Sequence, residues 1–125
     1  MLGNHPVAPI LLSTDLAESR AFYHDVLGLD VVREDPDRTV YRSGDSTLII
    51  REFKERTKDR QTQMAWLVPD VHAAVTDLRA RGVIIEEYDL PGLVTTDGVA
   101  DMGHSWVAWF VDPHDNVLAV AQGKD

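Results

Sequence analysis

The sequence predicts an α+β protein in which one unit, a strand and a helix followed by three strands, occurs twice. Two segments with helical spacing each begin at an aspartate and end at a glycine, Asp15 to Gly28 and Asp70 to Gly82. The two aspartates and the two glycines are separated by nearly equal steps along the chain. Strand-like segments flank both helices in the same order, which is typical of a tandem repeat.

The first helix is predicted to begin at Asp15. Aspartate is a preferred N-cap residue, and Glu18 three positions later gives a pattern close to a capping box. Residues with helical spacing then follow: Ser19, Phe22, Tyr23, Val26 and Leu27. Gly28 is predicted to end the helix, because glycine readily adopts the left-handed conformation found at helix C-termini.

The second helix is predicted to begin at Asp70 and to end at Gly82. Its buried stripe is formed by Val71, Ala74, Val75 and Leu78. Arg79 and Arg81 lie in the last turn, where positive charge is favoured by the helix dipole.

Each helix is preceded by one strand-like segment and followed by three. In the first copy these are residues 7–13, then 29–34, 38–42 and 47–53. In the second copy they are residues 64–68, then 83–88, 105–111 and 117–122. Tight turns at residues 43–46 and 112–116 are predicted to join the last two strands of each copy as a hairpin.

The chain of 125 residues is expected to form one domain, 1–125. Module one spans about residues 5–53, a charged linker about 54–62, and module two about 63–123. Residues 90–103 contain one proline and three glycines and are predicted to form a long loop. Such a loop can be functional, disordered or merely structural.

Composition excludes several classes of function. The chain has no cysteine, so disulfides, thiolate chemistry and sulfur-based zinc sites are ruled out. A net charge of −9 argues against nucleic acid and anionic membranes as partners, because both repel an acidic surface. No apolar segment of about 18 residues suggests a membrane span, and residues 1–7 do not have the pattern of a secretory signal. A cytoplasmic location is expected.

Three segments resemble the vicinal oxygen chelate (VOC) superfamily, which includes glyoxalases and bleomycin-resistance proteins. Residues 15–29 resemble its first-helix signature, with an aspartate cap, an aromatic pair and a Leu-Gly-Leu exit. Residues 66–82 fit its second strand-to-helix junction, and residues 109–118 resemble its last hairpin. Asp115 stands where that family usually has glycine, and aspartate tolerates the left-handed conformation better than most residues. We expect this hairpin turn to identify the fold without taking part in chemistry.

The resemblance implies two βαβββ modules whose curved half-sheets enclose a cup, often completed within a homodimer. It also implies where a divalent metal would be held. Counting from the motifs gives Ala8, Gln63 and Ala119, with a fourth position near residues 50–52. Alanine has no donor atom and Arg51 would repel a cation, so no divalent metal or other cofactor is expected. Glu52 could supply a second ligand only through a shift that changes the face of its strand.

Aromatic residues on the predicted strands favour a small-molecule pocket instead. Trp106 and Phe110 share one strand face and Trp109 the other, so one set lines the cup and the other packs under the helices. The predicted ligand-binding residues are Gln63, Arg51, Trp106, His104, Tyr41 and Trp66. His104, with Asp101 nearby, could orient the ligand or act as a weak acid–base. Each tryptophan could equally be a core residue, and Arg51 could face solvent.

Three functions stay open at this point. The first is a metal-free protein that binds a small, partly aromatic molecule and forms a homodimer. The second is a metal-dependent lyase, isomerase or dioxygenase of the VOC type. The third is a metal-independent enzyme that uses Arg51, Gln63 or His104. The identity of the ligand, and whether any reaction is catalysed, are not determined by the sequence.

Overall fold

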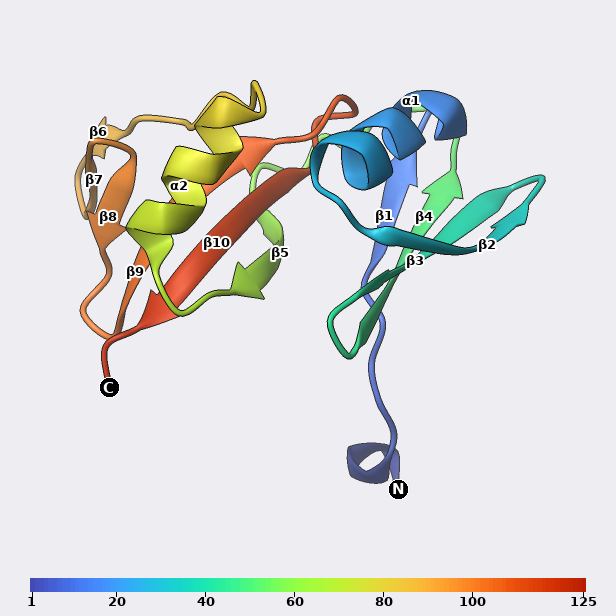
Figure 1. Cartoon of the computed structure of the whole chain (residues 1–125), viewed down its shortest axis with the longest axis horizontal. Coiled ribbons are helices and arrows are strands. Elements are labelled where there is room, and N and C mark those ends of the chain that lie inside the picture. The colour runs from blue at the N-terminus through green and yellow to red at the C-terminus, as the bar shows by residue number, and fades with distance from the viewer. The chain divides into compact units, whose positions relative to one another are not determined.

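The chain folds into two units, each made of an open mixed sheet and one main helical segment (Figure 1). The computed structural model describes all residues, 1–125. Unit 1 comprises Met1–Lys58 and Pro113–Asp115, and unit 2 comprises Asp59–Asp112 and Asn116–Asp125. The boundary between them falls within the segment predicted as a linker. The tip of the last turn therefore belongs to unit 1, although it connects two strands of unit 2.

Unit 1 has the predicted order of strand, helix and three strands. Its elements are a 3₁₀ helix η1 (Leu2–Asn4), β1 (Ile10–Ser13), α1 (Leu16–Arg20), η2 (Ala21–Val26), β2 (Asp30–Asp35), β3 (Arg38–Ser43) and β4 (Ser46–Glu52). The sheet order is β1-β4-β3-β2. β1 runs parallel to β4, and the other neighbours are antiparallel.

The capping residues of the first helix act as predicted. The Asp15 carboxylate accepts hydrogen bonds from the backbone N–H groups of Ala17 and Glu18, at 3.0 and 3.2 Å. Gly28 ends the helical segment with a φ of +82°. The segment is not α-helical throughout, because residues 21–26 form a π-helix, η2. Within it Leu27 N–H donates to the carbonyl of Phe22, one residue further back than in an α-helix.

The sheet of unit 1 has one face covered by the helix. Its side chains on that face are almost completely buried: Leu11, Ser13, Thr39, Tyr41, Leu48 and Ile50. Tyr23 of η2 packs against Tyr41, with ring centroids 5.8 Å apart. Ser19 of α1 donates a hydrogen bond of 2.7 Å to Ser13. The helix is therefore fixed to the sheet by both apolar and polar contacts.

Unit 2 repeats the arrangement with additional short strands. Its elements are β5 (Thr62–Leu67), α2 (Val71–Ala80), β6 (Asp89–Leu90), β7 (Leu93–Thr96), β8 (Val99–Asp101), β9 (Ser105–Val111) and β10 (Val117–Gly123). The order is β5-β10-β9-β8-β7-β6, with β5 parallel to β10. Asp70 caps α2 by accepting from Ala73 N–H at 3.1 Å, and Gly82 follows with a φ of +85°. Neither helical segment is long and apolar enough to cross a membrane.

Two predictions for the second copy are wrong. Residues 83–88 form no strand, and residues 90–103, predicted to be a loop, contain strands. The chain turns tightly at Gly92 and Gly98, with φ of +80° and +84°, so the presumed loop folds back into short antiparallel strands. β8 then takes the place beside β9, and Glu86 N–H makes a backbone hydrogen bond to the carbonyl of Trp109.

The tryptophans of unit 2 lie on both faces of its sheet. Gln122, which pairs with Trp106 across β10 and β9, accepts a hydrogen bond from Val71 N–H at the start of α2. Phe110 shares this helix-covered face and stacks on Trp66 at 6.0 Å. Trp109 lies on the opposite face, in an apolar cluster with Ala119 and their neighbours.

Candidate functional site

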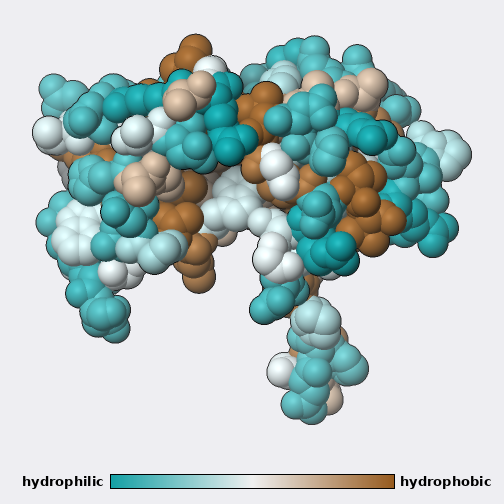
Figure 2. Space-filling view, in the orientation of Figure 1, coloured by the Kyte–Doolittle hydropathy of each residue, from teal (hydrophilic) through white to brown (hydrophobic).

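The face of the unit 1 sheet opposite α1 carries apolar and charged side chains that the helix does not cover. Cross-strand pairing places Ile10 and Leu12 of β1 beside Ile49 and Arg51 of β4. The antiparallel pairing of β3 with β4 places Val40 and Arg38 beside Ile49 and Arg51. We call this the open face. Ile10 is 59% exposed, whereas Leu11, its neighbour on the helix-covered face, is 3% exposed. Figure 2 shows apolar residues reaching the surface over the strands of unit 1, among hydrophilic ones.

Arg51 stands out among the charged residues of the open face. Arg33 and Arg38 both bind Asp35, with shortest distances of 2.9 and 3.1 Å. Arg42 lies 3.9 Å from Asp30. Arg51 is exposed, and its side chain makes no ion pair or hydrogen bond. It is thus the one arginine of this face whose charge is not matched by a protein carboxylate.

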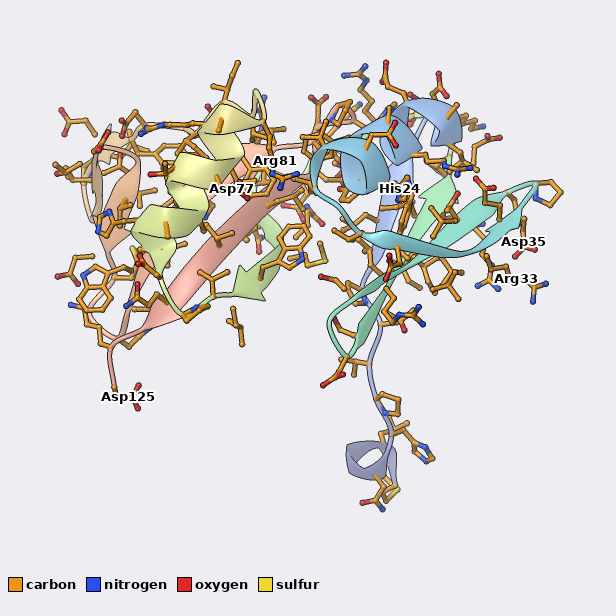
Figure 3. All side chains as sticks on the ribbon, viewed as in Figure 1. His24, Arg33, Asp35, Asp77, Arg81 and Asp125 are labelled. Atoms are coloured by element: carbon orange, nitrogen blue, oxygen red, sulfur yellow. The ribbon has the colours of Figure 1, made fainter.

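Asp35 binds two of the four arginines of the open face, Arg33 and Arg38. Hydrogen bonds from Arg33 and then Arg38 lower the pKa of this half-buried carboxyl. Figure 3 shows Arg33 and Asp35 on the side of β2 away from α1. Glu34, between them in sequence, lies on the helix-covered side, where it pairs with Arg20 at 2.6 Å. The alternation along β2 therefore separates two sets of charges onto the two faces.

The donors that a family-type metal site would need are missing from these strands. Ala8 precedes β1 and Ala119 lies in β10, and neither side chain has a donor atom. The register assigns Arg51 to the open face, and Glu52 pairs with Ser13 on the other face. Gln63 is a single neutral amide. No group of three histidine, aspartate or glutamate side chains is placed to hold an ion. These residues do not fit a divalent metal, which needs several nitrogen or oxygen donors.

All three tyrosine and tryptophan residues predicted for the site lie on helix-covered faces. Tyr41 is completely buried, and this burial raises the pKa of its hydroxyl. That hydroxyl has no hydrogen-bond partner of acceptable geometry, although Thr39 lies close on the same strand face. Trp66 packs on Phe110, and Trp106 lies under the ammonium group of Lys124, 4.9 Å from the ring centroid. Packing accounts for these positions, so a ligand contact for any of the three stays a prediction.

The remaining predicted residues do not form one cluster. His104 is exposed, and its Nδ1 lies 2.9 Å from the Ser105 hydroxyl. Asp101, predicted to assist it, binds Lys124 instead at 2.5 Å, and this contact lowers the pKa of Asp101. Gln63 is half-buried at an irregularity of the β5–β10 pairing and donates to the carbonyl of Gln61 at 3.3 Å. Of the predicted site residues in unit 1, only Arg51 lies on the face that the helix does not cover.

A groove of about 480 Å³ lies at the other side of unit 1, where β1 leads into α1. Its polar lining residues include Thr14, Asp15, Arg20, Glu34 and Glu52. Most of these side chains already bind one another or the helix N-terminus. The groove is open, and Glu52 is the one charged side chain of its lining that makes no ion pair or side-chain hydrogen bond, so few groups are left to recognise a ligand.

Sequence reasoning missed the polar contacts of His114. This residue of the predicted turn is 1% exposed, and its Nδ1 accepts a hydrogen bond from Thr14 N–H at 3.3 Å. The Thr14 hydroxyl lies 3.0 Å from the same nitrogen. Because Nδ1 is an acceptor, the ring proton sits on Nε2, which lies 3.0 Å from a carboxylate oxygen of Glu18. The turn therefore anchors itself beside the start of α1.

The turn around His114 keeps the predicted geometry. Asp115 adopts the left-handed conformation, with a φ of +69°, as expected for a residue in the usual place of glycine. Asp112 and Asn116 close the turn through hydrogen bonds of 2.8 to 3.0 Å, and both are buried.

Comparison with known proteins agrees with the observed fold. The bleomycin-binding protein of bleomycin-producing Streptomyces verticillus, solved with copper(II)-bleomycin, is 25% identical to this chain with a TM-score of 0.74. That match covers 96% of this chain and 97% of the other. A lactoylglutathione lyase from Agrobacterium tumefaciens is 20% identical, with a TM-score of 0.74 and coverage of 96% and 94%.

The sequence itself gives the assignment to a family. No protein with a curated description matches it significantly. The profile of the glyoxalase/bleomycin resistance protein/dioxygenase superfamily, however, matches residues 4–120. Since this match spans nearly the whole chain and the solved structures share its fold, the chain belongs to the glyoxalase/bleomycin resistance protein/dioxygenase superfamily.

Proposed function

We propose that this chain binds a small, partly aromatic molecule without a metal ion. The observation that carries the proposal is the open face of unit 1, where Ile10, Leu12, Val40 and Ile49 form an apolar floor beside Arg51. An apolar surface with a few polar groups at its edge is the usual composition of a small-molecule site.

The comparison with the bleomycin-binding protein supports a binding role over a catalytic one. That protein aligns over nearly its whole length at 25% identity and is described as binding its compound. The positions where metal ligands would be expected hold Ala8 and Ala119 in this chain. Without a metal, the Lewis acid that metal-dependent relatives use would be missing.

Nuclear magnetic resonance of the side-chain methyl groups tests this proposal directly. The full-length protein is titrated with a set of neutral and charged aromatic compounds, and the methyl signals of Ile10, Leu12 and Ile49 are followed. Saturable shifts confined to these signals are expected. If no compound of a chemically varied set shifts them, the open face is not a binding site.

A matched pair of variants separates binding on the open face from general apolar binding. Ile10 and Leu90 are both exposed isoleucine or leucine residues, at 59% and 53%, but Leu90 lies in unit 2. Ile10→Asn should weaken binding by roughly tenfold, because about 1.4 kcal/mol of apolar contact is lost. Leu90→Asn should leave it unchanged. Equal losses in both variants would contradict the site.

Two further properties belong to the same proposal. Metal analysis of the purified protein should find no stoichiometric nickel, zinc, manganese or iron, and finding one would overturn the metal-free assignment. The homodimer expected from the resemblance is tested by light scattering coupled to size exclusion. A mass of one chain, 14.0 kDa, at micromolar concentration would contradict it.

A further inference from the structure

We propose that Arg51 and Arg38 form a clamp for an anionic group at one end of an apolar ligand. The group is a carboxylate or a sulfonate, and the apolar body lies along Leu12, Val40 and Ile49. This inference rests on the proposed function, because it specifies the chemistry of a ligand bound at the open face.

The first argument is the position of the two arginines. Arg38 of β3 and Arg51 of β4 are direct partners across antiparallel strands. Directly opposed residues have Cβ atoms about 5 Å apart, where two like charges are destabilising. Asp35 offsets the charge of Arg38 in part, and an anion bound beside Arg51 would offset the rest of this repulsion.

The second argument is that the charge of this face is not balanced within the protein. The open face carries four arginines against two aspartates: Arg33, Arg38, Arg42 and Arg51, with Asp30 and Asp35. Asp35 is shared by Arg33 and Arg38, which leaves Arg51 without a carboxylate. The chain as a whole has a net charge of −9, so a cationic strip is a local exception. This cationic strip is complementary to an anionic ligand and would attract such a ligand to the open face.

The third argument is the apolar surface directly beside the clamp. Leu12 pairs with Arg51 across β1 and β4, and Ile49 lies two residues before Arg51 on the same face. Neighbouring strands are about 4.8 Å apart, so a ligand of one or two fused rings would cover both residues while its anionic end reaches Arg51. A guanidinium group matches a planar carboxylate with two parallel hydrogen bonds.

A pair of fluorescent dyes with the same aromatic body provides the test. Anilinonaphthalene sulfonate carries one anionic group, and phenylnaphthylamine lacks it. Both are titrated against the full-length protein, and methyl shifts of Leu12 and Ile49 locate the site. The wild-type protein should bind the sulfonate about tenfold more tightly than the neutral dye, which is the effect of one charge-assisted hydrogen bond at an exposed site.

Arg51→Gln should abolish this preference and leave binding of the neutral dye unchanged. Arg60→Gln is the matched control, because it removes the same charge from the exposed linker segment. Both variants should have circular dichroism spectra like that of the wild type, since both side chains are exposed. Arg38→Gln should reduce the preference less, because Arg38 is already engaged by Asp35.

The outcomes distinguish the clamp from the binding site on which it depends. Equal affinity of the wild type for the two dyes, with shifts at Leu12 and Ile49, would overturn the clamp and support the proposed function. An equal loss of preference in Arg51→Gln and Arg60→Gln would also overturn the clamp, since it would reflect total charge alone. Failure of both dyes to shift these methyl signals would overturn the clamp together with the open-face site.

Discussion

Replacement of His114 by alanine should destabilise unit 1 by about 2 to 4 kcal/mol. The substitution removes the acceptor of the Thr14 N–H, and leaving such a donor unsatisfied costs about 1 to 3 kcal/mol. It also empties the space of a side chain that is 1% exposed, which adds a cavity cost of about 1 kcal/mol or more. The Glu18 contact adds little, because Glu18 is 52% exposed and its charge is screened by water.

The matched variant is His114→Asn. The asparagine side-chain oxygen occupies the place of Nδ1, so it can accept from Thr14 N–H, while the contact to Glu18 is lost. We expect His114→Asn to cost about half as much as His114→Ala, since the acceptor is kept and only ring volume is lost.

Two measurements are needed because the aromatic reporters are unevenly distributed. All three tryptophans lie in unit 2. Urea unfolding is therefore followed by far-ultraviolet circular dichroism, and hydrogen exchange of the Thr14 amide provides the local readout. Faster Thr14 exchange is expected in His114→Ala and near wild-type exchange in His114→Asn. A cost below about 0.5 kcal/mol with unchanged Thr14 exchange would show that His114 does not make this contact in solution.

Three other predictions concern the cores and acid stability. Tyr41→Phe should leave thermal stability unchanged or raise it by up to about 1 kcal/mol, because it removes a buried hydroxyl without a well-aligned partner; a clear loss would contradict this. Gly98→Ala should be less stable in urea than Gly92→Ala by about 1 to 3 kcal/mol. The two share the same backbone strain, but only at Gly98 would the new Cβ meet a side chain, at 2.7 Å; equal costs would refute the clash. The depressed pKa of Asp35, caused mainly by Arg33, contributes stability above the ordinary carboxyl value of 3.8 that is lost as pH falls through the lower folded value. As pH falls below 4, the free energy of unfolding of Asp35→Asn should therefore decrease less steeply than that of the wild type. The same pH dependence in both proteins would argue against a contribution from Asp35.

The sequence was sufficient for the repeat because the signals that define it are local. Asp15 and Asp70 cap their helices, and Gly28 and Gly82 end them, through contacts with residues only a few positions away. Cap chemistry of this kind is readable from composition and spacing. The hairpin turn with Asp115 is predictable for the same reason.

The errors in the second copy arise from tertiary context. Residues 83–88 are rich in β-branched residues and resemble a strand, but Val83 and Ile85 are instead buried beside the end of α2 and Gly98. Residues 90–103 contain several residues typical of turns, which favoured a loop, but these turns connect short strands. Period and composition do not decide which segment occupies a sheet edge, because that depends on packing.

The site residues show the same division between local and distant information. Strand alternation and hairpin register correctly separate Arg51 from Glu52. They could not reveal that Tyr41 lies under the helix, since both faces of β3 carry apolar residues. The contacts of His114 could not be predicted from local sequence patterns, because its partner Thr14 is 100 positions away.

The turn at Pro113–Asp115, which belongs to unit 1 but connects two strands of unit 2, has a consequence for folding during synthesis. Synthesis proceeds from the N-terminus, so Thr14 and Glu18 leave the ribosome long before His114 does. Until then, the loop of 100 residues between Thr14 and His114 cannot close, and contacts of such separation slow folding. The N-terminal half should thus remain unfinished during translation. Its last contact is made by a turn that also connects β9 to β10, so we expect the two halves to reach their native state late and together rather than in the order of their synthesis.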